Sequence, residues 1–294
     1  MSSVISAAAW CGRLELEYAD RQGKTIPSRV FGQAPLKVQR PFYPEDESVC
    51  HSVILHTAGG IVGGDWLDLK VDLQPHTQAV ITSAAAAKIY RSNGQEAQQM
   101  THLRVGKSAC LEWLPQETIV FNGANYQQRL RVDLAADAIW FGWDMTRLGR
   151  SARGEQFASG TWRSQTEVWQ DDQLIWVDPQ RIQGGSTMMS SLHGLAGYPV
   201  IASCAFVGRA VSKDLVATVR SVWEEDEGKA SQRDGVTADE MRAEVGVTRL
   251  MSGLLCRYRG NSTIEARQWF VRVWEIMRQF YLGRSVSVPR VWQV

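Results

Sequence analysis

An alternation of apolar and polar residues with a period of two runs through the first two thirds of this chain. In segment 66–73 the odd-numbered positions are all Leu or Val and the even-numbered ones are Trp, Asp, Lys and Asp, which is typical of a strand with one buried face. Turn-forming pairs such as Asn93-Gly94 and Asn122-Gly123 separate such segments. Further strands are predicted at 13–18, 49–56, 77–83, 88–92, 109–114, 118–121, 126–134, 162–169, 174–177 and 200–207. Many short strands without crossover helices predict a sandwich, barrel or β-solenoid, not a doubly wound sheet.

The pattern changes after about residue 185. A helix is predicted at 214–225, followed by an exposed acidic turn and a linker at 228–235, and a strand at 254–258. Ser262 and Glu265 have the spacing of a capping box. The helix that they open carries an apolar stripe that should face the core, formed by Phe270, Val273, Trp274 and Met277. We expect one domain over 1–294, strand-rich to about residue 210 and helix-containing over 211–294.

The composition is that of a globular chain without a strong electrostatic field. Its 32 Lys and Arg residues nearly balance 31 Asp and Glu, so nothing favours nucleic acid or an acidic membrane as a partner. Five scattered cysteines fit reduced thiols, and no segment resembles a signal peptide or a membrane span. Twelve tryptophans favour broad sheet faces or interfaces. We therefore expect a cytoplasmic protein.

Four glycines and one acid lie in the ten residues 56–65, as Gly59, Gly60, Gly63, Gly64 and Asp65. Such a cluster indicates a tight turn or a close approach of another backbone or a ligand. A phosphate-binding loop would need a Lys followed by Ser or Thr and then a helix. Here Asp65 and a predicted strand follow, so the pattern argues against nucleotide binding.

The ligand-type residues do not form a recognisable metal or catalytic motif. The five histidines lack paired spacing, and no Cys/His cluster is present, so a preformed zinc or nickel site is not predicted. Carboxylates could still hold an ion in passage. The acids set among apolar or aromatic neighbours are Asp65, Asp144, Glu155, Glu167 and Asp178. Each is more simply a hydrogen-bonded or surface carboxylate.

Several collinear segments resemble the UreD family of urease accessory proteins, called UreH in some species. The family motifs are matched by Gly59-Gly60-Ile61-Val62-Gly63-Gly64-Asp65 and by Lys88-Ile89-Tyr90-Arg91-Ser92. Further matches are residues 38–44, 111–117, 148–150 with 154, 155 and 157, and the terminal Pro289-Arg290-Val291-Trp292. The likeness spans about residues 38 to 294, and its motif positions include Lys88, Tyr90 and Arg91.

The resemblance implies a non-enzymatic scaffold with an irregular, β-helix-like stack of strands. UreD-like proteins bind apo-urease and recruit UreF, which docks the GTPase UreG that delivers nickel. Nickel would pass through the protein without being held tightly. On that picture Asp65, Glu167 and Asp178 would line the path, Asp178 standing where relatives often carry a glutamate.

Two alternatives stay open from the sequence. One is a cytosolic β-rich hydrolase that uses acids such as Asp65 and Glu155. The other is a β-solenoid binding module without any connection to nickel.

Overall fold

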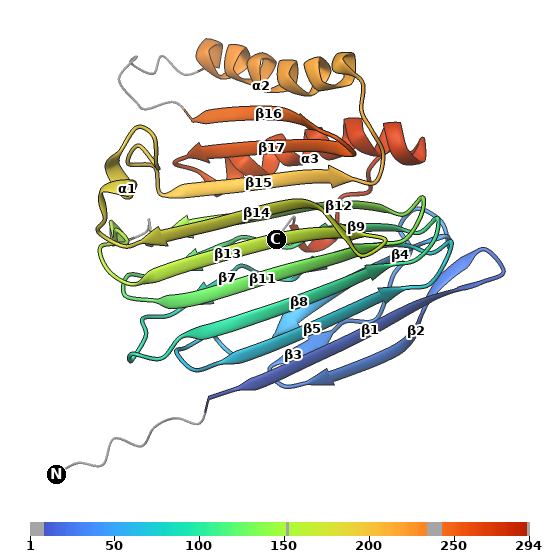
Figure 1. Ribbon diagram of the computed structural model, residues 1–294, viewed down its shortest axis with the longest axis horizontal. Helices are drawn as coiled ribbons and strands as arrows, with labels where there is room; N and C mark the ends of the chain where they lie inside the picture. Colours follow the sequence, from blue (N-terminus) through green and yellow to red (C-terminus); the bar gives the residue numbers. More distant parts are fainter. Residues whose placement is uncertain (1–8, 151–152, 234–242, 293–294) are drawn as a thin grey trace.

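Two facing β-sheets and a pair of helices make up the computed structural model, which describes residues 9–150, 153–233 and 243–292 (Figure 1). Sheet A has seven strands, in the spatial order β14(Gln173–Gln183), β13(Thr161–Gln170), β11(Asn125–Leu134), β8(Ala97–Val105), β5(Trp66–Leu73), β1(Cys11–Arg21) and β2(Lys24–Gln33). Sheet B runs β16(Glu244–Leu250), β17(Gly253–Gly260), β15(Val200–Val207), β12(Ile139–Leu148), β9(Cys110–Leu114), β6(Gln78–Ser83), β4(Val49–His56) and β3(Leu36–Val38). The short strands β7(Ala87–Ile89) and β10(Thr118–Val120) extend sheet B from β12.

The chain winds between the sheets as a β-solenoid does. From β4 to β13 it passes back and forth between sheet B and sheet A, and neighbouring turns pair in parallel within each sheet, as β4 with β6 and β5 with β8. The predicted β-helix-like stack is confirmed. Antiparallel strands complete the edges, with β1–β2 and β13–β14 in sheet A and β15, β17 and β16 in sheet B.

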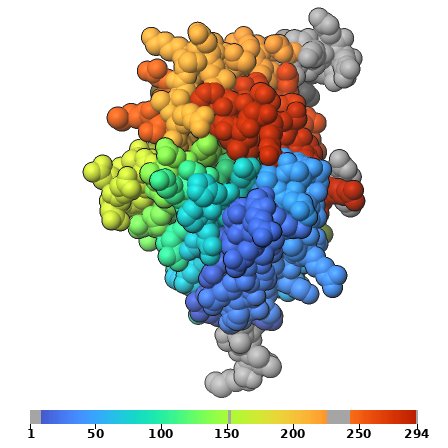
Figure 2. Space-filling model, turned by 90° about the vertical axis from the view of Figure 1, so that its right-hand side faces the viewer, coloured from blue at the N-terminus to red at the C-terminus, as the bar shows by residue number. Residues whose placement is uncertain are grey.

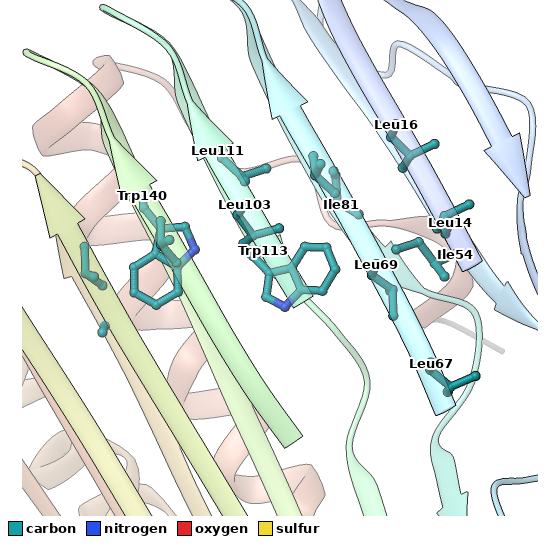
Figure 3. Close-up of a cluster of buried hydrophobic side chains, with 14 of the residues drawn as sticks. Leu14, Leu16, Ile54, Leu67, Leu69, Ile81, Leu103, Leu111, Trp113 and Trp140 are labelled. Carbon is teal, nitrogen blue, oxygen red and sulfur yellow. The ribbon is translucent and has the colours of Figure 1, made fainter. Parts of the chain in front are cut away.

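Two apolar cores follow from this arrangement. One lies between the sheets, where Leu67, Ile81 and Trp113 are buried (Figure 3). The other lies between sheet B and the helices α2(Lys213–Arg233) and α3(Thr263–Leu282). Strand β12 serves both cores, because Trp140 faces the first and Phe141 the second. In the side view of Figure 2 the C-terminal elements form one end of the molecule and the N-terminal strands lie toward the other.

The late helices begin where the sequence predicts them. The Ser262 hydroxyl accepts a hydrogen bond from the Glu265 amide at 3.2 Å, and α3 ends at Gly283 in the left-handed conformation. The four residues of its predicted stripe are fully buried, namely Phe270, Val273, Trp274 and Met277. Helix α2, however, continues to Arg233 through the predicted acidic turn and most of the predicted linker, since the single Gly228 costs a helix only about 1 kcal/mol. Residues 234 and 235 of that linker lie outside the described residues.

The remaining features are two short helical segments and the state of the cysteines. A four-residue helix, α1(Thr187–Ser190), and a short 3₁₀ turn at Arg290–Trp292 complete the structure. Within the described residues, no helix combines the length and the apolar character that crossing a bilayer requires. The described cysteines are all free thiols, four of them buried.

Candidate functional site: a cavity between the sheets

A cavity of about 580 Å³ separates part of the inner face of sheet A from that of sheet B. It reaches the surface where strands of sheet B end, because its lining includes the exposed Gly59, Ala85 and Lys88. The residues 84–87 at this mouth are all alanine, and their small side chains leave the passage open. These four alanines thus form part of the rim of the opening.

The inner end of the cavity is polar, unlike the rest of the inter-sheet core. Adjacent strands of sheet A place Gln99, Gln128 and Ser164 in one register row and Thr101 and Thr166 in the next. All five side chains line the cavity, as does Asp144 from β12 on the opposite sheet. Uncharged donors and one carboxylate therefore face each other across the inner end.

Asp144 is the acid of this cavity. Its Oδ2 accepts hydrogen bonds from the Gln128 amide and, at 3.3 Å, from the Ser164 hydroxyl, which are both neutral groups. Burial raises the pKa of the Asp144 carboxyl to about 6; hydrogen bonds from Ser164 and Gln128 oppose the rise, and the negative charge of Asp178 adds to it. The carboxylate is thus ionised at neutral pH without a salt bridge among the described residues.

Four polar side chains lie beyond the cavity lining, three of them one strand away and Arg257 two strands away. In sheet A, Gln180 and Asp178 on β14 are the register partners of Ser164 and Thr166. In sheet B, Ser203 pairs with Asp144, and Arg257 pairs with Ser203. The Arg257 guanidinium joins the sheets by donating from Nη2 to Asp178 Oδ1 at 2.5 Å and from Nη1 to Ser203 Oγ at 3.0 Å. Gln180 Nε2 bonds Asp178 Oδ2 at 3.1 Å and Ser203 Oγ at 3.3 Å.

The glycine-rich segment forms a tight loop beside the mouth. A Cβ on Gly60 would lie 2.4 Å from Tyr90 Cε2 and 2.6 Å from the Lys88 carbonyl, and one on Gly63 would lie 2.7 Å from the Gln95 carbonyl. Gly64 has a φ of +95°. Asp65 is buried, and its two oxygens accept the backbone N–H groups of Trp10 at 2.8 Å and Val62 at 2.9 Å. Asp65 therefore fixes the loop, and it is not among the cavity-lining residues.

The motif Lys88-Ile89-Tyr90-Arg91-Ser92 packs against this loop. The Tyr90 hydroxyl donates to the Gly59 carbonyl at 3.0 Å, and its ring meets Phe121 edge to face. The aliphatic part of Arg91 lies over Gly123, where a Cβ would come within 2.9 Å of Arg91 Cγ. Of the three charged or aromatic motif residues, Lys88 alone lines the cavity.

Two other acids named from the sequence lie elsewhere. Glu167 sits on β13 between the cavity-facing Thr166 and the buried Val168, so its side chain is on the other face of the strand. There it bonds the Trp169 indole N–H at 2.9 Å. Glu155 pairs with Arg150 and accepts the Asn122 amide at 2.8 Å. Neither side chain lies in the cavity.

No three His, Cys, Asp or Glu side chains gather into a metal-binding group among the described residues. Near the inner end of the cavity the groups that could bind a metal are two carboxylates, Asp144 and Asp178, with amide and hydroxyl oxygens around them, and the cavity lining also includes His56. Oxygen donors of this kind suit weakly held hard or borderline cations.

The sequence contained a usable signal for this site. Gln99, Thr101, Gln128, Ser164 and Thr166 are polar at positions where the period of two requires core residues. Polar residues on the inner face of several adjacent strands indicate a cavity, but their adjacency is known only once the register is known.

Comparison with known proteins gives a consistent result over nearly the whole chain. Residues 11–293 match the family described as "UreD urease accessory protein". The chain is 54% identical over 288 residues to a protein from Nostoc punctiforme named urease accessory protein UreD, covering 98% of each chain. The protein of the same name from Trichormus variabilis is 51% identical over 284 residues, with 97% of this chain and 96% of the relative covered. A Synechocystis protein of that name is 39% identical over 277 residues, which is 94% of this chain and 98% of the relative.

Proposed function

Because this chain belongs to the UreD family of urease accessory proteins, we propose that it serves urease maturation as a scaffold. It binds apo-urease and recruits UreF, which brings the GTPase UreG. The aromatic-rich chain has almost no net charge, which suits a protein whose partners are other proteins. The scaffold itself catalyses no reaction.

The proposal has a second part, which is that nickel in transit passes between the two sheets. The cavity is the observation that supports it. The cavity opens at the loop end of sheet B and ends at a carboxylate whose described hydrogen-bond donors are neutral. A passing cation would meet amide and hydroxyl oxygens and then Asp144, with Asp178 one strand further. Few ligands are an advantage for transit, because an ion that is held weakly can leave.

The residues predicted for this path divide into two groups. Asp178 lies next to the cavity, and Asp144 joins it as the acid that lines the inner end. Asp65 is engaged by two backbone amides, and Glu167 faces away from the cavity. The proposed path therefore uses Asp144 and Asp178, whereas Asp65 supports the mouth loop.

Reconstitution tests the proposal. Apo-urease, UreF and UreG are combined with nickel in the presence or absence of this chain, and the complexes are purified and analysed for nickel. We expect UreF and UreG to co-purify with apo-urease only when the chain is present, and urease to stay nickel-poor and inactive without it. Active, nickel-loaded urease formed in its absence would refute the proposal.

The same experiment separates the alternatives. Stable binding to apo-urease and UreF without any effect on nickel content would identify a binding module. Turnover of a substrate by the purified chain alone, abolished by Asp65→Ala or Glu155→Ala, would identify a hydrolase.

A further inference from the structure

The cavity is closed on one side by a thin wall. Its lining stops at Ser164 and Thr166 in sheet A and at Asp144 in sheet B. Beyond these residues sheet A has one more strand, β14, whereas sheet B continues with β15, β17 and β16 (Figure 1). The wall therefore consists of side chains that reach from the edge strand β14 to the strands of sheet B opposite it.

Arg257 holds this wall together. Its guanidinium bonds Asp178 from one sheet and Ser203 from the other, and Gln180 bonds the same two residues. The Arg257 side chain is 43% exposed, whereas that of Asp178 is 7% exposed. Arg257 is thus the solvent-facing member of the ion pair, and Asp178 is the buried one.

The charges on the two sides of the wall differ. Asp178 is compensated by Arg257, but the described contacts of Asp144 include no cation. The two carboxylates lie close enough for the charge of Asp178 to act on Asp144. A divalent cation between them would be balanced by the two carboxylates alone, and Arg257 would then be a surplus positive charge that like-charge repulsion disfavours.

We propose that the Asp178–Arg257 ion pair is a latch in the side wall of the cavity, which opens when a divalent cation reaches Asp144 and displaces the guanidinium from Asp178. Released, Arg257 extends into solvent, and the wall beside β14 opens for the cation to leave. This inference rests on the proposed passage of nickel through the cavity. It adds a side exit and the residue that controls it.

Reactivity of the guanidinium reports the latch directly. The purified chain is treated with an arginine-selective dicarbonyl reagent, with and without excess Ni²⁺, and modification of each arginine is followed by peptide mass spectrometry. We expect Ni²⁺ to raise the modification rate of Arg257 by about fivefold, a factor appropriate to the loss of one partly exposed ion pair. Arg249, exposed on the neighbouring strand β16, is the internal control and should not respond.

Two variants test whether the faster modification of Arg257 with Ni²⁺ depends on Asp178 and Asp144. In Asp178→Asn, Arg257 should react fast with or without Ni²⁺, because its charged partner is gone. In Asp144→Asn, Arg257 should stay slow in both conditions, because a divalent cation lacks the second carboxylate. Circular dichroism melting checks that both variants are folded, and the wild-type comparison needs no variant.

An Arg257 rate that does not change with Ni²⁺ in the wild-type chain would overturn the latch. So would an equal response of Arg257 in Asp144→Asn. Either result leaves urease activation by the wild-type chain unaffected, so failure of the latch is distinct from failure of the proposed function. Conversely, if Arg257 responds to Ni²⁺ but urease matures without this chain, the proposed function is refuted and the latch is supported.

Discussion

At the scale of a single residue, the ionised Asp144 carboxylate that the proposed site needs lowers the stability of the fold. Burial raises its pKa to about 6, so the folded chain holds a proton there more tightly than the unfolded chain does. The stability that this proton confers is complete below the ordinary pKa of 3.8 and is lost as the pH rises through about 6. At neutral pH the fold therefore carries the cost of a charge at a half-buried position.

Asp144→Asn should stabilise the protein at pH 8, because it removes that charge and keeps an acceptor for Gln128. The difference from the ordinary pKa corresponds to about 3 kcal/mol at most, and we expect a gain of roughly 1–3 kcal/mol in the free energy of unfolding. The gain should vanish near pH 4. Urea unfolding at both pH values measures it, with Asp171→Asn in an exposed turn as the matched control. A loss of stability at pH 8 would contradict this assignment.

At the scale of elements, the strands that the sequence failed to predict are as informative as those it predicted. Strands β5 and β11 have clean alternation and were predicted nearly to their ends. Strand β12 was missed because it is buried on both faces and its sequence, IWFGWDMTRL, does not alternate between apolar and polar residues. Strand β8 was missed because Gln99 and Thr101 line the cavity, where core residues would otherwise stand.

The glycine loop was predicted as a tight turn, and its packing distinguishes one glycine from another. Gly63→Ala should cost roughly 1–3 kcal/mol, because a Cβ would lie 2.7 Å from the backbone oxygen of Gln95. Gly59→Ala is the matched control, since the nearest atom to its Cβ would be the Tyr90 hydroxyl oxygen at 3.9 Å. Chemical denaturation compares the two variants. Equal losses of stability in the two variants would contradict the idea that close packing is what requires glycine at position 63.

At the scale of the whole molecule, a buried ionic network joins the two ends of the sequence. Arg278 on α3 is fully buried and forms ion pairs with Glu45 at 2.9 Å and with Glu112 at 3.1 Å, and Glu112 accepts a hydrogen bond from the Trp274 indole at 2.5 Å. Burial raises the pKa of Glu112, and the charge of Arg278 opposes that rise. These contacts depend on tertiary structure, so the sequence revealed only the apolar stripe of α3.

Removing the cation from that network should be costly. Arg278→Met leaves two carboxylates beside each other without their partner, and we expect a loss of about 3–5 kcal/mol. Adding Glu112→Gln to the same chain should restore part of it, because the buried charge is then gone. Thermal and urea unfolding of the single and double variants form the comparison. A double variant that is no more stable than Arg278→Met would contradict the proposed coupling.

Passage of nickel between the sheets is the central functional claim, and the nickel content of urease tests it most directly. Complexes of apo-urease, UreF and UreG are assembled with the wild-type chain or with Asp144→Ala, and nickel per urease active site is counted after equal times. We expect Asp144→Ala to form the same complex but to load urease about tenfold more slowly, consistent with the loss of one charged contact. Nickel loading at the wild-type rate in an intact Asp144→Ala complex would contradict passage through the cavity.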